Sequence, residues 1–172
     1  VDLSAKRSHI NAYRNQDKDN IEIFVGNFAD IEPSLDNDYD FACMIGVFEY
    51  GQSYIASKTP YEDFLNIMRK HVKNNGRIVI AIENKFGLKY WAGCKEDHLG
   101  TYFSGLEGYP DGGSARTFTR SGLERIFKKC GVENYSFYYP YPDYKFPIAI
   151  YSDKRLPDSG ELTDNIRNFD RD

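Results

Sequence analysis

Short runs of apolar residues alternate along the chain with stretches in which apolar positions recur at helical spacing. The run from Phe41 to Phe48 is nearly continuous, as expected for a central parallel strand that is covered on both faces. Residues 77–82 form a second buried run, and residues 21–25 alternate like a strand that stops at Gly26. Residues 1–3 look like the end of a further strand.

Helix signals lie between these strands. Ser4 can cap a helix that runs to about Gln16, because its hydroxyl can accept a hydrogen bond from a free N–H of the first turn. A capping box at residues 59–62, with Pro60 at the first helical position, begins a second helix. We expect that helix to end at residues 74–76.

Regularity fades between Glu83 and Thr119, where glycine and aromatic residues accumulate. Loops of this length without structure of their own are usually functional. Thr119 or Ser121 caps a last helix, and Gly131 stops it.

The remaining residues predict a closing hairpin and a tail. Residues 135–139 and 148–151 look like an antiparallel strand pair, and residues 153–172 read as a polar linker or tail. Strands that alternate with helices predict a three-layer α/β domain, here over residues 1–152. Ligands of such folds bind at the carboxyl ends of the strands.

Composition places the chain among ordinary globular domains. Apolar residues make up 41% and charged residues 28%, and a length of 172 residues fits one domain. The net charge of −4 argues against a general nucleic-acid binder, and no apolar run approaches the ~20 residues of a membrane span. Cys43, Cys94 and Cys130 are too widely spaced for a disulfide framework or a metal pair, so a reducing, cytoplasmic setting is expected.

Residues that follow the strands are candidates for ligand contacts. Asp2 can accept hydrogen bonds from a ribose diol, or it can be a charge favoured at a helix N-terminus. Asn27 can meet an adenine edge with Phe28 over the ring, or the pair can form a simple turn. Gly46 permits close approach of a ligand, and Glu49 can bind an amino group or be solvated.

Four motifs follow one another along the chain: Val1-Asp2-Leu3-Ser4, Val25-Gly26-Asn27-Phe28, Tyr39-Asp40-Phe41 through Val47-Phe48-Glu49-Tyr50, and Asn75-Gly76-Arg77-Ile78-Val79-Ile80. Their order and spacing resemble those of the class I S-adenosylmethionine-dependent methyltransferases, over roughly residues 1–151. A later set, Ile82–Tyr90, Glu96-Asp97-His98 and Arg116-Thr117-Phe118-Thr119, resembles more narrowly methyltransferase domains of bacterial lipopolysaccharide and cell-surface glycan biosynthesis proteins. Those domains are often fused to glycosyltransferases.

The resemblance implies a Rossmann-like sandwich with S-adenosylmethionine as the cofactor. Asp2 would hold the ribose, and Leu3 would pack on the adenine. Asn27 stands where the family often has Asp reading the adenine amino group, and its amide oxygen can still accept a hydrogen bond. Phe28 would flank the ring, and residues 45–47 would line the methionine arm. The implied cofactor residues are Asp2, Leu3, Asn27, Phe28, Ile45, Gly46 and Val47.

The glycine-rich loop of that family, which lies on its first strand, has no counterpart in this chain. In the family that strand lies between the strands that correspond to residues 1–3 and 41–47. The resemblance therefore implies a fold truncated at its N-terminus, with a gap in the sheet whose N–H and C=O groups would be costly if buried unpaired. We expect the chain as given to bind the cofactor weakly, and pairing with another copy is one way to fill the gap.

Methyl transfer to a hydroxyl benefits from a base within reach of its proton. His98 is the candidate catalytic base, because a carboxylate beside it can orient the imidazole and raise its pKa, although a surface histidine is the alternative. No metal is expected, since no ligand spacing such as His-x-x-x-His occurs. Candidates for the acceptor site, each with an alternative as a turn, ion-pair or packing residue, are Glu83, Asn84, Tyr90, Tyr109, Arg116 and Tyr144.

Three functions follow from these observations. The favoured one is a methyltransferase domain that acts on a small polar acceptor, a sugar or nucleotide-linked sugar in cell-surface polysaccharide biosynthesis, with fused glycosyltransferase domains as expected partners. The second is a non-catalytic methyltransferase-like module that binds a glycan or a partner enzyme. The third is an NAD-type α/β enzyme, against which the closing antiparallel strands argue.

Overall fold

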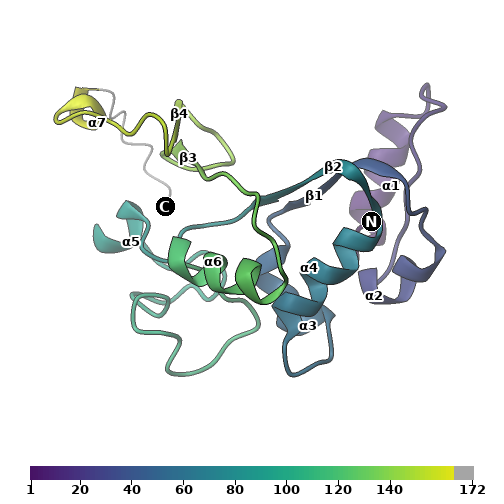
Figure 1. Cartoon of the computed structure of the whole chain (residues 1–172), viewed down its shortest axis with the longest axis horizontal. Coiled ribbons are helices and arrows are strands. Elements are labelled where there is room, and N and C mark those ends of the chain that lie inside the picture. The colour runs from purple at the N-terminus through teal and green to yellow at the C-terminus, as the bar shows by residue number, and fades with distance from the viewer. Residues whose placement is uncertain (165–172) are drawn as a thin grey trace. The chain divides into compact units, whose positions relative to one another are not determined.

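The computed structural model describes residues 1–164 and divides the chain into two compact units (Figure 1). The first unit, residues 1–131, holds the parallel strands and the helices predicted around them. The second unit begins at Val132 and holds the antiparallel strand pair. Each unit is described separately below.

The sheet of the first unit consists of β1 (Tyr39–Ile45) and β2 (Val72–Ala81), which pair in parallel. The register is regular from Phe41 onward but shifts at the start, where Tyr39 pairs with Val72. Residues 74–76, expected to end a helix, lie within β2 instead. The reason is that the Tyr39 N–H donates to the His71 carbonyl, which brings the chain into the sheet directly after the helix.

The helices that flank the sheet begin close to their predicted positions. The prediction of a helix after Ser4 is confirmed by α1 (Ala5–Arg14), in which the Ser4 hydroxyl accepts the Arg7 N–H at 3.3 Å. The last predicted helix is α6 (Arg120–Lys129), in which the Thr119 hydroxyl accepts the Gly122 N–H at 3.0 Å. The chain leaves α6 through Gly131, whose φ of 64° is readily adopted by glycine.

The helix predicted after Thr59 is α4 (Pro60–Lys70), but its capping box is absent. The Thr59 side chain makes no capping hydrogen bond to the backbone. Its hydroxyl donates to the Asp63 carboxylate at 3.2 Å instead, which satisfies the hydroxyl without a free N–H of the first turn. Pro60 at the first helical position is confirmed.

The face of the sheet toward the helices holds the core. Ala42 and Met44 of β1 are buried on that face, and the short helix α3 (Gly51–Tyr54), α4 and α6 lie along one side of the two strands (Figure 1). Phe41 is 64% exposed and Ile45 is 51% exposed. The expectation of a strand covered on both faces is therefore wrong for β1, because these alternate side chains keep half or more of their surface exposed within residues 1–164. The described part is mixed α/β, with a two-stranded parallel sheet and an antiparallel pair.

Short elements connect these parts. The expected strand over residues 21–25 is wrong in extent, because Val25 alone makes a bridge there, a parallel one to Asp2. The short elements that follow are α2 (Phe28–Ile31), the 3₁₀ helices η1 (Glu32–Ser34) and η2 (Phe48–Tyr50), and, in the long loop, α5 (Leu88–Trp91).

The second unit contains the predicted hairpin. It pairs β3 (Tyr138–Tyr141) with β4 (Ala149–Ser152), so the first strand begins three residues later than expected. A short helix, α7 (Glu161–Asp164), lies within the segment expected to be a linker or tail, and the rest of that segment falls outside the described residues. Among residues 1–164, no helix combines the length and the apolar character that a membrane span needs.

Candidate functional site

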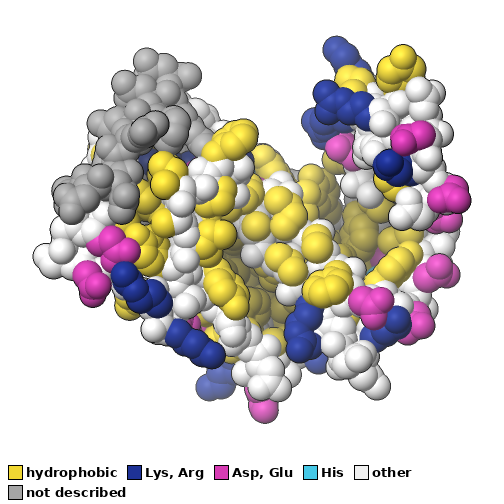
Figure 2. All heavy atoms as spheres, turned by 90° about the horizontal axis from the view of Figure 1, so that it is seen from above, with side chains coloured by type: hydrophobic (Ala, Val, Ile, Leu, Met, Phe, Trp, Pro, Cys, Tyr) yellow, Lys and Arg dark blue, Asp and Glu magenta, His cyan; other side chains and the backbone are white. Residues whose placement is uncertain are grey.

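A cavity of about 440 Å³ in the first unit lies between the N-terminal segment and β1. This volume falls within the range of small-molecule sites. Hydrophobic side chains gather over the face of the molecule that carries β1 and β2 (Figure 2). Five of the seven expected cofactor residues line the cavity: Asp2, Leu3, Phe28, Ile45 and Val47.

Asp2 and Asn27 come from adjacent segments, as expected, because Asp2 bridges Val25 in parallel. Both side chains have partners within the chain. The Asp2 carboxylate accepts the Ser4 N–H at 2.7 Å and pairs with the Arg7 guanidinium, and the hydrogen bond from Arg7 is the main cause that lowers the pKa of Asp2. The Asn27 amide oxygen accepts the Ala29 N–H at 3.2 Å and caps α2. This local hydrogen bond agrees with the alternative interpretation of Asn27 as a turn residue.

Gly46, the remaining expected cofactor residue, continues the sheet beyond β1. Its N–H donates to the Ala81 carbonyl at 2.8 Å, and its φ of 64° turns the chain into η2. This turn carries Glu49 away from the solvent, so that its side chain is 1% exposed. The interpretation of Glu49 as a solvated residue is therefore wrong.

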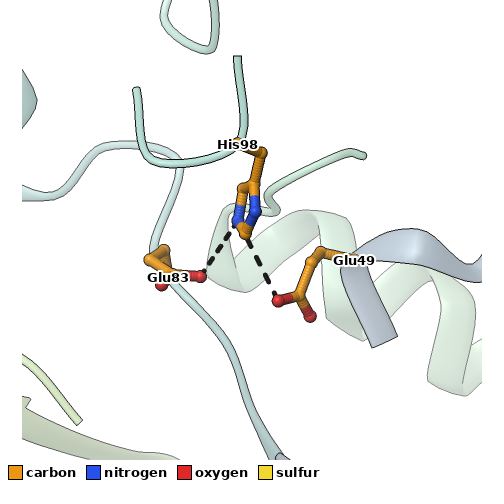
Figure 3. Close-up of side chains that lie close together, drawn as sticks. All are labelled: Glu49, Glu83 and His98. Carbon is orange, nitrogen blue, oxygen red and sulfur yellow. Dashed lines mark hydrogen bonds and ion pairs between the residues drawn. The ribbon is translucent and has the colours of Figure 1, made fainter. Parts of the chain in front are cut away.

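A second group of polar side chains, Glu49, Glu83 and His98, meets beyond the carboxyl ends of β1 and β2 (Figure 3). Glu49 follows β1, Glu83 follows β2, and His98 comes from the long loop. The His98 Nε2 atom lies 3.2 Å from Glu83 Oε2 and 3.9 Å from Glu49 Oε1. The carboxyl ends of parallel strands share one edge of a sheet, which explains why these residues lie close together.

His98 is held on both ring nitrogens. Its Nδ1 atom lies 2.8 Å from the Tyr50 hydroxyl, opposite the Nε2 contact with Glu83. The hydrogen bond with Glu83 is the main cause that raises the pKa of His98, and burial acts in the opposite direction. The side chain is 8% exposed, so the interpretation as a surface histidine is wrong.

Hydrogen bonds to buried hydroxyl and carboxylate groups hold the loop around His98 in place. The Glu96 carboxylate accepts the His98 and Leu99 N–H groups at 2.8 and 3.0 Å. The Tyr109 hydroxyl donates to Glu96 at 3.2 Å and accepts the Thr117 N–H at 2.8 Å. These bonds tie residues 96–99 to residues 109–117 and position the imidazole.

The other candidate acceptor residues occupy different environments. The Tyr90 side chain is buried and its hydroxyl donates to Asp97 at 3.1 Å. The Asn84 amide oxygen accepts the Phe86 N–H at 3.0 Å in a turn, and the Arg116 guanidinium lies 4.6 Å from the centre of the Tyr109 ring. Tyr144 belongs to the second unit. Their roles at an acceptor site stay predictions.

Sequence reasoning missed the joint position of Glu49 and Tyr50 with His98. The one available signal was that Glu49 and Glu83 each follow a buried strand, which predicts a shared edge. Nothing in the sequence places His98 there, because its loop has no periodic pattern. No protein-family model, no curated protein and no solved structure matches this chain.

Proposed function

We propose that the chain is an S-adenosylmethionine-dependent methyltransferase domain that acts on a small polar acceptor, a sugar or nucleotide-linked sugar in cell-surface polysaccharide biosynthesis. The observation that supports the proposal is the cavity beside β1, which collects five of the residues expected to bind the cofactor. In this proposal the parallel sheet belongs to a Rossmann-like sandwich.

The walls of the cavity suit a nucleoside. Leu3 and Phe28 provide apolar surface for a base, and Asp2 supplies a carboxylate that two ribose hydroxyls can reach. The Arg7 side chain, which now pairs with Asp2, is 71% exposed. An ion pair at this exposure contributes little to stability, so ribose hydroxyls can replace the guanidinium on the carboxylate at small cost.

The proposed reaction is a displacement at carbon. A lone pair of the acceptor oxygen attacks the methyl carbon, the carbon–sulfur bond breaks, and its electrons neutralise the sulfonium to leave a thioether. The acceptor hydroxyl loses its proton. In the neutral form of His98 in which Nε2–H donates to Glu83, the Nδ1 atom accepts a hydrogen bond from the Tyr50 hydroxyl. We propose that the acceptor hydroxyl passes its proton to the Tyr50 oxygen while Tyr50 passes its own proton to Nδ1.

The experiment that tests cofactor binding is a titration of the ¹⁵N-labelled chain with S-adenosylhomocysteine to millimolar concentration, followed by NMR. This method detects the weak binding that we expect. Shift changes are expected to cluster at Leu3, Phe28, Ile45 and Val47. Asp2→Asn should weaken binding, whereas the control Asp17→Asn, at an exposed ion pair with Lys18, should not. Shift changes confined to other residues, or none at millimolar ligand, would contradict the proposal.

One observation favours the second candidate function, a non-catalytic methyltransferase-like module. Both Asp2 and His98 already have partners within the chain, as expected of residues that hold a fold together. A module of this kind predicts glycan binding without any response to S-adenosylhomocysteine. The same titration, repeated with an oligosaccharide of the cell-surface type, separates the two candidates.

A further inference from the structure

The cluster of Glu49, Glu83 and His98 brings two carboxylates and one imidazole together in a buried setting. The side chains of Glu49 and Glu83 are 1% and 2% exposed, and both carboxylates face the same imidazole nitrogen. Buried carboxylates need positively charged or hydrogen-bonding neighbours, and a bound cation is one neighbour of that kind.

The spacing of the three donor atoms suits a cation. The Nε2 atom of His98 lies 3.2 and 3.9 Å from the two carboxylate oxygens, and all three donor atoms lie within 4.8 Å of one another. Ligand atoms bound to Zn²⁺ in a tetrahedron at about 2.0–2.1 Å lie roughly 3.4 Å apart. A single ion can therefore contact all three atoms with only small side-chain movements.

The surroundings of His98 are those of a metal ligand. A metal-binding histidine commonly donates its second ring N–H to an oxygen, which fixes the tautomer and directs the other nitrogen at the ion. The Tyr50 oxygen lies 2.8 Å from Nδ1 and can accept that hydrogen bond, while Nε2 faces the two carboxylates. Glu96 holds the backbone of the same loop through two N–H groups.

We propose that Glu49, Glu83 and His98 bind a divalent first-row transition-metal ion, for which Zn²⁺ is the probe. One imidazole with two carboxylates is a mixed nitrogen and oxygen donor set, which suits such an ion better than Mg²⁺ or Ca²⁺. Three protein ligands leave a fourth position for a water molecule or a hydroxyl group. The site shares His98 with the methyl-transfer proposal. With the ion on Nε2 and a proton on Nδ1, the imidazole does not accept a further proton, so metal binding and the base role of His98 exclude one another.

The proposed site differs from the expectation that no metal binds, and the reason is geometric. Spacing rules detect ligands that lie close in sequence on one helix or turn. Here Glu83 lies 34 positions after Glu49 in the sequence, and His98 lies 15 positions after Glu83. The sheet edge brings the donor atoms together, so no local sequence motif predicts the site.

The test is calorimetric titration of the full chain, freed of metal with a chelator, with ZnCl₂ in the absence of any nucleotide. We expect one ion per chain. Glu49→Gln and Glu83→Gln keep the side-chain shape and remove a ligand charge, so each should weaken binding by more than the roughly 10–100-fold cost of outer-shell substitutions. Glu107→Gln, at an exposed position of the same loop region, is the matched control and should bind as the unaltered chain does.

A measurement on the unaltered chain covers the case in which a variant fails to fold. The histidine side-chain NMR spectrum should show one of the three imidazoles shift at Nε2 on addition of Zn²⁺ while its Nδ1 keeps its proton. Absence of stoichiometric binding, or equal binding by Glu83→Gln and the unaltered chain, would overturn the proposal. Because no nucleotide is present, failure here leaves the methyl-transfer proposal intact.

Discussion

Arg7 Nη2 lies 2.7 Å from Asp2 Oδ1 and Arg7 Nε lies 3.0 Å from Asp2 Oδ2, so the guanidinium grips both oxygens of the carboxylate. This pair joins the N-terminal segment to the first turn of α1. It also occupies the group that the methyltransferase proposal assigns to a ribose. In that proposal Arg7 competes with the ligand, and its removal separates the structural use of Asp2 from its proposed use in binding.

Arg7→Gln is expected to increase the affinity for S-adenosylhomocysteine, because the Asp2 carboxylate no longer has to exchange a guanidinium for the ribose hydroxyls. The cost in stability should be small, since the pair is exposed to solvent. NMR titration gives the affinity and urea denaturation gives the free energy of unfolding. Weaker binding in this variant would show that Arg7 itself contacts the ligand.

The stability of the chain should depend on the ionisation of Asp2 in acid. Arg7 and the Ser4 N–H lower the pKa of Asp2 below its usual value of 3.8 in the folded state. The stabilisation is then fully present above that value and is lost as the pH falls through the folded pKa. Urea denaturation of the unaltered chain and of Asp2→Asn should give curves that converge at low pH, and a constant difference between them would contradict the assignment.

The parts of the fold that short-range chemistry determines were predictable, and those that depend on distant partners were not. Ser4, Thr119 and Gly131 act within one helical turn. The roles of Ser4 and Gly131 are confirmed, and Thr119 is the cap of the two expected candidates, Thr119 and Ser121. Thr59 had the same local pattern but binds Asp63 instead of the helix backbone. Local sequence does not decide between two hydrogen-bond partners of similar strength.

The same division applies to the two candidate sites. Asp2 and Phe28 were expected at the cavity because they follow predicted strands, and the ends of parallel strands share an edge. Leu3, Ile45 and Val47 were implied by the family resemblance alone, and the cofactor role of all five stays a prediction. Whether both faces of β1 are covered could not be predicted from the sequence, because an apolar run shows only that its side chains are suited to burial. Which layers are present to cover Phe41 and Ile45 is a property of the tertiary fold.

Tyr109→Phe is expected to destabilise the first unit by about 1–3 kcal/mol. The hydroxyl lies in a buried network, where it accepts the Thr117 N–H and donates to Glu96. Without it, a buried N–H and a carboxylate each lose a partner. Urea denaturation measures the change, and Tyr102→Phe, at an exposed ring of the same loop, is the control. Equal effects of the two substitutions would show that the network contributes nothing.

Phe48→Ala should be the most damaging substitution in the core. The ring is fully buried and stacks on Phe64 at 5.9 Å, with Tyr61 and Phe118 at 5.7 and 5.8 Å between ring centres. Removal of a buried phenylalanine side chain costs about 3–5 kcal/mol through lost burial and the cavity that remains. The free energy of unfolding from urea denaturation gives the value.

Phe41→Ala is the matched substitution, because it removes the same side chain from the uncovered face of β1. With the ring 64% exposed, the expected loss is within about 0.5 kcal/mol. A loss close to that of Phe48→Ala would mean that the face is covered in solution. Repeating the measurement across protein concentrations then identifies the cover, since a second copy of the chain makes the loss concentration-dependent and a rearranged segment of the same chain does not.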